Sequence, residues 1–262
     1  MQADDLHLVA EHNFQLVIHS AEQLAQIDET LSRLTLKQPL TLWLKMDSGM
    51  GRLGLSPHGF SRTYKALLGR PYTDKVVMMT HLANSSQPDA SLNLKQLNVF
   101  REIETELADD LHATSIPASS GILSDLSVDS TWARPGIMLY GSSPFDYSHE
   151  GSRREAFELK AVMTLRARII AIKDMHKGDN VGYSSQYICP KDMRVGIVSI
   201  GYADGYPSNA PNDTPVMVKG IKTATLGRVS MDMLAVNLSD IPDANVGDLA
   251  TLWGQELSVD EV

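Results

Sequence analysis

Hydrophobic and polar residues in the first half of the chain alternate between the spacing of strands and the spacing of helices. Short apolar runs typical of buried strands occupy residues 14–18, 40–47, 76–80, 113–116 and 137–140. Between the first four runs, apolar residues recur three and four positions apart, which predicts amphipathic helices. Strands that alternate with helices are typical of parallel βαβ units, as in an α/β barrel.

Two of the predicted helices carry further signals. Ser20 and Gln23 have the spacing of a capping box, so a helix should begin at Ser20. Another helix should cover about 60–68, and a longer one about 91–111. The longer helix should turn one apolar stripe towards the sheet, made of Leu94, Leu97, Phe100, Ile103 and Leu107.

The pattern changes after residue 141. A stretch rich in serine, glycine and charged residues runs from about 142 to 155 and predicts a linker. Beyond it almost no helical spacing remains, and apolar residues form strand-like segments at 159–172, 195–200, 216–218 and 224–238. We therefore predict two domains, an α/β domain over residues 1–150 and a β-rich domain over residues 151–262.

Composition narrows the class of partner. The chain of 262 residues carries a formal net charge of −9, which argues against nucleic acid as a main partner because phosphate binding needs basic patches. No apolar run approaches membrane-spanning length, and the first residues lack the pattern of a signal peptide. Cys189 is the single cysteine, which excludes an intrachain disulfide. We expect a soluble, cytoplasmic protein.

The strongest candidate chemistry follows the strand over residues 40–47. That strand runs into a turn over 48–54 that contains three glycines, and Lys45, Asp47 and Arg52 are the charged residues at this end. In α/β enzymes the chemistry lies where parallel strands end. A surface loop with solvated charges is the alternative interpretation.

Two other turns offer groups that could bind an anion. Ser119-Ser120-Gly121 follows a strand and begins a short predicted helix, where hydroxyls and free N–H groups suit a phosphate. Arg134-Pro135-Gly136-Ile137 places a cation beside a glycine that permits close approach. Each of these segments is also common in plain surface turns.

Histidine and tyrosine supply the remaining candidates. His81 ends a buried strand, where a histidine is more often a structural hydrogen-bonding group than a catalyst. Tyr183, Tyr202 and Tyr206 lie in glycine-containing loops, where tyrosines usually only pack. A phenol titrates near pH 10, so it would act as a base only in a cationic or hydrogen-bonded setting. The sequence contains no zinc-ligand spacing, Walker A sequence or dinucleotide fingerprint.

Taken together and in their order, these segments resemble alanine racemases, which are fold-type III enzymes that use pyridoxal 5'-phosphate (PLP). The resemblance spans nearly the whole chain and is carried by KMDSGMGRLG (45–54), THLANSS (80–86), PASSG (117–121), ARPGIMLYG (133–141), VGYSSQY (181–187), IGYADGYP (200–207) and GRVSMDM (227–233). It implies a TIM-type α/β barrel, here partial, followed by a C-terminal β-rich domain. This agrees with the change of pattern near residue 150.

The resemblance implies a PLP site in the first domain. Arg134 would hydrogen-bond the pyridine nitrogen, which would stay largely unprotonated because a guanidinium does not give up its proton. The electron sink would then be weak, and the chemistry would narrow to proton exchange at Cα. The phosphate would be held by Ser119, Ser120, Gly136 and Ile137, the last two through backbone N–H groups.

Other residues receive substrate roles from the resemblance. Arg52 would face the phenolic oxygen of PLP and the substrate carboxylate, and Lys45 is where many members carry a carbamate that holds this arginine. His81 would lie beside the cofactor and help to set the catalytic tyrosine. Met231 would offer its backbone N–H to the substrate carboxylate, and Tyr202 would narrow the entrance.

The implied activity is the interconversion of L- and D-alanine, which supplies D-alanine for peptidoglycan. Tyr183 would take the proton from L-alanine and would reach the site from the other subunit, because the family works as a head-to-tail homodimer. The spacing from Tyr183 to Met231 and the GYADGYP loop favour alanine, because in the family these elements crowd the pocket.

One departure from the family is large. The family's PLP-bearing lysine lies in a segment like K-A-N-A-Y-G-H-G on the first barrel strand, and no lysine here has that context. We expect a chain truncated at both ends, which begins inside the barrel, stops before the end of the β-rich domain and has little racemase activity alone. The alternatives are a related PLP racemase or decarboxylase, and a non-catalytic remnant that binds a ligand or dimerises.

Overall fold

The computed structural model describes residues 3–124, 126, 129–146 and 157–262. These residues form two compact units, which we describe each by itself. The first contains the described residues up to Met138 and also 144–146, and the second contains 139–143 and the residues from 157 onward. Most of the predicted linker over 142–155, and the predicted boundary at 150, lie outside the described residues.

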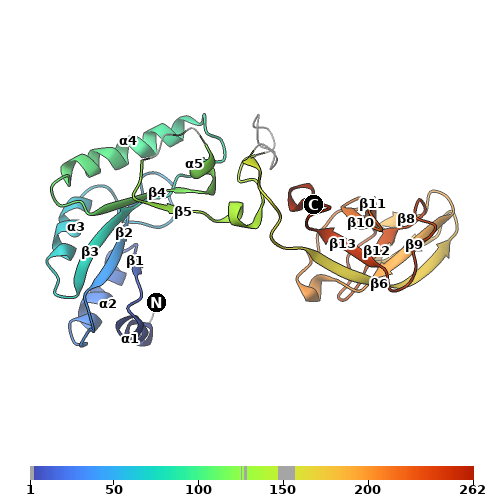
Figure 1. The fold of residues 1–262 in the computed structure, drawn as a ribbon, viewed down its shortest axis with the longest axis horizontal. Helices are drawn as coiled ribbons and strands as arrows, with labels where there is room; N and C mark the ends of the chain where they lie inside the picture. The colour runs from blue at the N-terminus through green and yellow to red at the C-terminus, as the bar shows by residue number, and fades with distance from the viewer. Residues whose placement is uncertain (1–2, 125, 127–128, 147–156) are drawn as a thin grey trace. The chain divides into compact units, whose positions relative to one another are not determined.

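The first unit is built on a five-stranded parallel sheet with the order β1-β2-β3-β4-β5 (Figure 1). The strands are β1 (Leu16–Ile18), β2 (Leu40–Lys45), β3 (Thr73–Met79), β4 (Ala113–Ala118) and β5 (Trp132–Arg134). The strand order follows the sequence order, as the predicted βαβ units require.

The helices of this unit bury one face of the sheet. They are α1 (Ala3–His12), α2 (Ala21–Leu31), α3 (Phe60–Leu68), α4 (Ser91–Glu106) and α5 (Ser119–Leu123). In β2 the buried side chains Leu40, Leu42 and Leu44 alternate with partly exposed ones, and they share one core cluster with α2, α3 and α4. The predicted helix start is confirmed, since Ser20 caps α2 by accepting the N–H of Gln23 at 3.2 Å.

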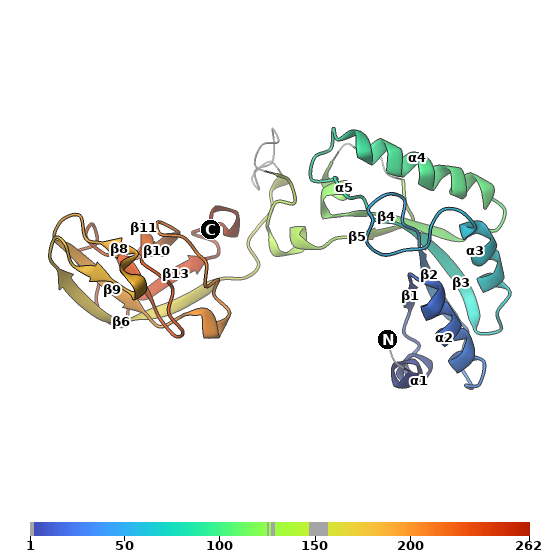
Figure 2. The same cartoon turned by 180° about the vertical axis from the view of Figure 1, so that it is seen from behind.

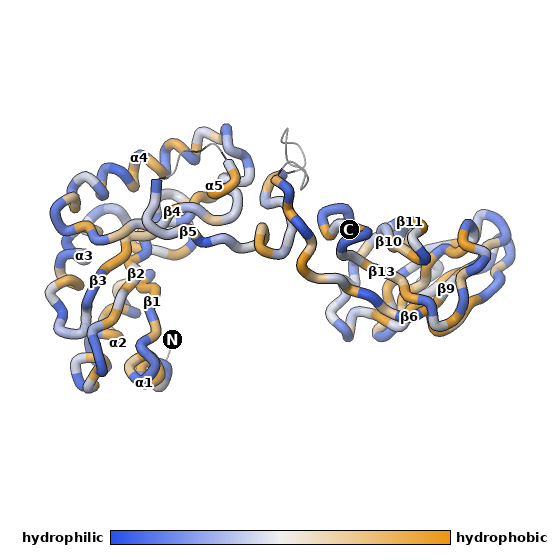
Figure 3. The backbone as a smooth tube through the Cα atoms, in the orientation of Figure 1, coloured by the Kyte–Doolittle hydropathy of each residue, from blue (hydrophilic) through white to orange (hydrophobic). Residues whose placement is uncertain are grey.

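Helix α4 differs from the prediction in its buried residues and in its end, which had been placed at residue 111. The helix ends at Glu106, and Leu94 is 61% exposed. Two amides, Asn93 and Gln96, take buried positions on the helix because each finds hydrogen-bond partners in the loop before it. The helix still alternates between hydrophilic and hydrophobic residues along its length (Figure 3).

The prediction of a strand over 137–140, the last in the first domain, was also wrong. Residues Ile137–Tyr140 form a 3₁₀ helix, and the strand β5 precedes it at Trp132–Arg134. Pro135 explains the change, because proline has no N–H with which to continue the ladder on β4.

The second unit is a closed antiparallel barrel of six strands in the order β10-β11-β12-β9-β6-β13. They are β6 (Leu165–Met175), β9 (Met193–Val198), β10 (Pro215–Val218), β11 (Ile221–Leu226), β12 (Leu234–Asn237) and β13 (Leu249–Trp253). A separate hairpin pairs β7 (Asn180–Val181) with β8 (Tyr187–Ile188). Closure leaves the barrel without an open edge.

Two strand boundaries in this unit differ from the prediction. The segment 224–238 is not one strand, because it contains the end of β11 and the whole of β12 with the loop 227–233 between them. Gly227 opens that loop with a φ of +69°, a conformation that ends the strand. The strand predicted over 159–172 starts later, at Leu165. Among the helices in the described part of the chain, none is long and apolar enough to span a membrane.

Candidate active site

The carboxyl ends of the parallel strands bring most of the predicted site residues to one edge of the sheet. Lys45 ends β2 and pairs with Met79 at the end of β3, so His81 follows just beyond that edge. Ala118 ends β4 opposite Arg134 on β5. Figure 2 shows the short helix α5, which begins with Ser119, beside β4.

Arg134 is the centre of this edge. Its Nη2 donates to the carbonyl oxygens of Thr80 (2.7 Å) and Ile116 (3.1 Å), and its Nη1 donates to the hydroxyl of Ser115. The same Nη2 lies 3.4 Å from Nδ1 of His81. The guanidinium therefore ties together β3, β4 and β5, and burial lowers its pKa.

His81 is neutral in this setting. Burial, followed by the positive charges of Arg134, Arg52 and Lys45, lowers its pKa from 6.5 to about 4. Arginine can only donate, so a hydrogen bond between Arg134 and Nδ1 of His81 requires that this nitrogen carry no proton. Near neutral pH this imidazole therefore stays uncharged and can act as a hydrogen-bonding group.

The depressed pKa of His81 predicts a pH-dependent stability. The unfolded histidine binds a proton below pH 6.5 whereas the folded one does so only near pH 4, so the free energy of unfolding should fall between these values as pH decreases. Urea unfolding of the parent and of His81→Gln at several pH values measures this, since the difference between them isolates His81. Parallel pH profiles over this window would contradict the assignment.

The loop between Met46 and Leu55 presents Arg52. Oδ1 of Asp47 accepts three backbone N–H groups, from Gly49 (3.0 Å), Met50 (2.8 Å) and Gly51 (3.1 Å). Burial raises the pKa of this carboxyl, but hydrogen bonds from the loop amides outweigh burial and lower it overall. Asp47 stays ionised and fixes the turn, while Arg52 itself is exposed.

Lys45 lies among positive charges. Burial lowers its pKa first, and Arg52 and Arg134 lower it further, against a smaller opposite effect of Asp47. A lysine in such surroundings is more often neutral, and therefore more nucleophilic, than one in water.

Hydroxyl groups and backbone amides converge beside Arg134. Oγ of Ser119 accepts the N–H groups of Gly136 (2.8 Å) and Met138 (3.3 Å). Ser120 is buried and its Oγ lies 2.6 Å from that of Ser85. Ile137 lies between the two amides that point at Ser119.

The other predicted residues gather on the second unit. Tyr183, Tyr202 and Met231 are exposed by 66%, 44% and 55%. Their loops are connected, since Tyr202 donates its N–H to Ser230 O (3.0 Å) and Ala203 donates its own to Met231 O (2.9 Å). Tyr206, in contrast, is buried in the barrel core.

The structure therefore forms two clusters. The first unit brings together Lys45, Arg52, His81, Ser119, Ser120, Arg134, Gly136 and Ile137. The second brings together the loops of Tyr183, Tyr202 and Met231. Among the described residues, no group of histidine, cysteine and carboxylate side chains could hold a metal ion.

Several residues that build the first cluster were not predicted as site residues, although Thr80 and Ser85 lie in the THLANSS segment. Thr80, Ser115 and Ser85 support predicted residues, and Gln96 connects two loops. Gln96 offered a weaker signal, as a polar residue at helical spacing from Phe100, with which it shares the buried side of α4.

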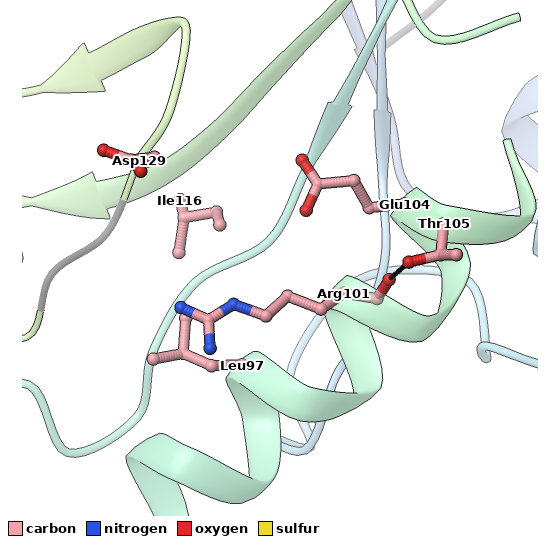
Figure 4. Close-up of a pocket in the computed structure, with 6 residues that line it drawn as sticks. All are labelled: Leu97, Arg101, Glu104, Thr105, Ile116 and Asp129. Atoms are coloured by element: carbon pink, nitrogen blue, oxygen red, sulfur yellow. Dashed lines mark hydrogen bonds between the residues drawn. The ribbon is translucent and has the colours of Figure 1, made fainter. Parts of the chain in front are cut away.

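Cavities elsewhere do not involve these residues. A cavity of about 330 Å³ lies between α4 and β4 and contains Arg101, Glu104 and Asp129 among its lining residues (Figure 4). Burial raises the pKa of Glu104 there. A groove of about 520 Å³ on the second unit includes Arg166, Arg168 and Lys219. None of the predicted site residues lines either space.

Comparison with known proteins places both units in one family. Residues 1–144 match the family described as alanine racemase, N-terminal domain, and residues 162–262 match alanine racemase, C-terminal domain. The chain is 42% identical over 261 residues to an alanine racemase of Pseudomonas taetrolens and to a catabolic alanine racemase of Pseudomonas putida. Each match covers 100% of this chain and 70% of the relative.

Comparison with solved structures gives the same family. The crystal structure of the biosynthetic alanine racemase of Pseudomonas aeruginosa matches with a TM-score of 0.88 at 40% identity, and that of the Acinetobacter baumannii enzyme with 0.87 at 33%. Both matches cover 100% of this chain and 70% of the solved chain. They confirm the predicted fold class, a parallel α/β domain followed by a β-rich domain. The chain belongs to the alanine racemase family of isomerases.

Proposed function

We propose that the first unit binds PLP and that the chain serves the interconversion of L- and D-alanine. The observation that carries this proposal is the first cluster. In it the hydrogen-bonded guanidinium of Arg134 lies beside the neutral His81 and beside the hydroxyl and amide groups around Ser119. The family implies the cofactor, and the residues of this chain fit its phosphate and ring.

The fit to a phosphate rests on Ser119. Its Oγ accepts two backbone N–H groups that converge on one point, and an added Cβ on Gly136 would lie 3.6 Å from this oxygen. A phosphate oxygen could accept the same N–H groups, with the hydroxyls of Ser119 and Ser120 as further donors. Ile137 would contribute its backbone N–H.

Arg134 would face the pyridine nitrogen. Thr80 O, Ile116 O and Ser115 hold the guanidinium in place, so the approach of the ring would need little rearrangement. Bound PLP supplies an electron-withdrawing ring that makes a Cα proton of the substrate more acidic. Because arginine keeps its proton, Arg134 would leave the ring nitrogen largely unprotonated, and the chemistry would narrow to exchange of the Cα proton.

Arg52 would face the substrate carboxylate, and a carbamate on Lys45 would hold Arg52 in place. A carbamate on Lys45 would replace a cation near Arg52 and Arg134 by an anion. The lowered pKa of Lys45 favours the neutral amine, which attacks carbon dioxide and loses a proton to form the carbamate. Carbon-13 NMR with labelled bicarbonate would detect the carbamate. A spectrum unchanged by Lys45→Ala would count against it.

The second unit would complete the site of a partner subunit. Tyr183 would accept and return the Cα proton on the L-alanine face, Met231 would offer its N–H to the carboxylate, and Tyr202 would narrow the entrance. Their exposure leaves them free to meet another chain. Sedimentation should then give a homodimer, and a strictly monomeric chain would exclude this arrangement.

The family also implies a supply of D-alanine for peptidoglycan. The relatives named above include one called catabolic and one called biosynthetic, at similar identity. A different amino acid as substrate is the second possibility. Binding of alanine and of larger amino acids to the PLP-loaded chain, followed by the absorbance of the cofactor, separates the two without requiring turnover.

Cofactor binding is the direct test of the proposal. The chain should retain PLP on dialysis, with its absorbance changed relative to free PLP, and should bind pyridoxal without the phosphate more weakly. Ser119→Ala should weaken PLP about tenfold, because one charge-assisted hydrogen bond is lost, and leave pyridoxal unaffected. Borohydride treatment followed by peptide mapping would show whether a lysine of this chain bonds PLP. Equal affinity for PLP and pyridoxal would refute the assigned phosphate site.

A further inference from the structure

Gln96 is a buried amide whose side-chain nitrogen and oxygen both form hydrogen bonds. It is 0% exposed on α4, and its Nε2 donates to His81 O (3.1 Å) and to Ser48 Oγ (3.2 Å). Its Oε1 accepts the N–H of Ala83 at 2.8 Å. The amide therefore contacts two loops, the one with His81 and the one that presents Arg52.

A chain of hydrogen bonds leads from Gln96 towards Arg134. Thr80 donates its hydroxyl proton to Met46 O at 2.9 Å, so in the 2.8 Å contact between the two hydroxyls it is Ser48 that donates to Thr80. The carbonyl of the same Thr80 accepts Nη2 of Arg134. Gln96, Ser48 and Thr80 thus form one buried, directed network.

Packing adds to this connection. Gly49 has a φ of +137°, and an added Cβ there would lie 3.3 Å from Cγ of Gln96. The Arg52 loop therefore rests directly on the side chain. An apolar residue of similar size would fill the space, but it would leave Ser48, the carbonyl of His81 and the N–H of Ala83 without this partner.

We infer that Gln96 is a positioning residue, which sets the Arg52 loop and His81 in register with Arg134. The importance of Gln96 for catalysis rests on the proposed function. The positions of the Arg52 loop and His81, which Gln96 sets, can be measured without a cofactor. The inference goes beyond the predicted site, since Gln96 touches none of the side chains proposed to bind PLP or alanine.

Asn93 provides a matched control. It is also a fully buried amide on α4, and its Nδ2 makes three hydrogen bonds, to the carbonyls of Asn84 (3.2 Å), Gln87 (3.0 Å) and Pro88 (3.1 Å). These partners lie in the later part of the same loop. A residue that merely stabilises α4 and its loop would behave as Asn93 does.

The experiment compares Gln96→Met with Asn93→Leu in the chain without cofactor. NMR titration follows the imidazole of His81 between pH 5 and 8, where the groups that act on it are Arg134, Arg52 and Lys45. Hydrogen exchange follows the amides of Gly49, Met50 and Gly51. With Gln96→Met, His81 should begin to titrate in this range and the loop amides should exchange roughly tenfold faster. Asn93→Leu should leave both unchanged.

Ser48→Ala is a second variant that removes a smaller group. It should speed exchange in the Arg52 loop while His81 remains neutral, because Gln96 keeps its bonds to His81 O and Ala83 N. The inference fails if Gln96→Met changes neither the titration of His81 nor the exchange of the loop amides. It also fails if Gln96→Met and Asn93→Leu change them equally. Since neither readout needs PLP, a chain that fails to bind PLP would refute the proposed function separately.

Discussion

Replacing Arg134 by leucine should unfold the chain at markedly lower urea concentration and abolish retention of PLP. The substitution leaves the carbonyls of Thr80 and Ile116 and the hydroxyl of Ser115 without their charged donor. Each buried acceptor left unpaired costs about 1–3 kcal/mol, so a loss on the order of 3 kcal/mol or more is expected. Equilibrium urea unfolding and dialysis with PLP measure the two effects.

Two further variants separate charge from geometry. Arg134→Lys keeps the charge but cannot reproduce the planar fork, and should recover only part of the stability. Arg33→Leu removes an exposed arginine whose ion pair with Glu29, 3.2 Å long, is worth at most about 0.5 kcal/mol. An Arg134→Leu chain as stable as Arg33→Leu would show that the guanidinium does not hold the three strands together.

Most of the elements followed from apolar spacing. The runs that became β2 and β3 are buried on the helix side, and their alternation with helices was enough to predict parallel pairing. The prediction failed at Ile137–Tyr140, because four residues of apolar sequence suit a 3₁₀ helix as well as a strand. It also failed at Leu94, because local hydrogen bonding placed Asn93 and Gln96 in the buried positions instead.

The site was predictable where it depends on strand ends. Lys45 ends and His81 follows a strand that the sequence predicted, so the topology alone brings them to one edge. Arg134 was not predictable in this way, because it ends β5 whereas the strand had been predicted after it, at 137–140. The spacing of apolar residues could not predict which groups accept hydrogen bonds from Arg134. Two of these acceptors are the main-chain carbonyls of Thr80 and Ile116, which carry no sequence signal. The low pKa of His81 depends on its burial and on the positive charges of Arg134, Arg52 and Lys45, so it too emerged only from the fold.

Gly54→Ala should have the second large effect, because the loop that presents Arg52 closes at this glycine. Gly54 has a φ of +133°, and an added Cβ would lie 2.5 Å from the backbone nitrogen of Asp47 and 2.7 Å from the carbonyl carbon of Met46. Backbone atoms cannot turn aside as a side chain can. The hydrogen bonds of Asp47 N to Leu55 O (2.9 Å) and of Leu55 N to Lys45 O (2.8 Å) should therefore break.

Gly51 in the same loop is the matched control for this substitution. Its φ is +70°, and an added Cβ would meet nothing within 4 Å, so Gly51→Ala should cost only about 1 kcal/mol of backbone strain. Gly54→Ala should cost on the order of 3 kcal/mol, from the strain at φ +133°, the clash and the two lost bonds. Urea unfolding gives both values, and exchange of the Leu55 amide reports the loop alone. Equal losses for the two variants would mean that positive φ, rather than the close contact with Asp47, makes glycine necessary at the turn.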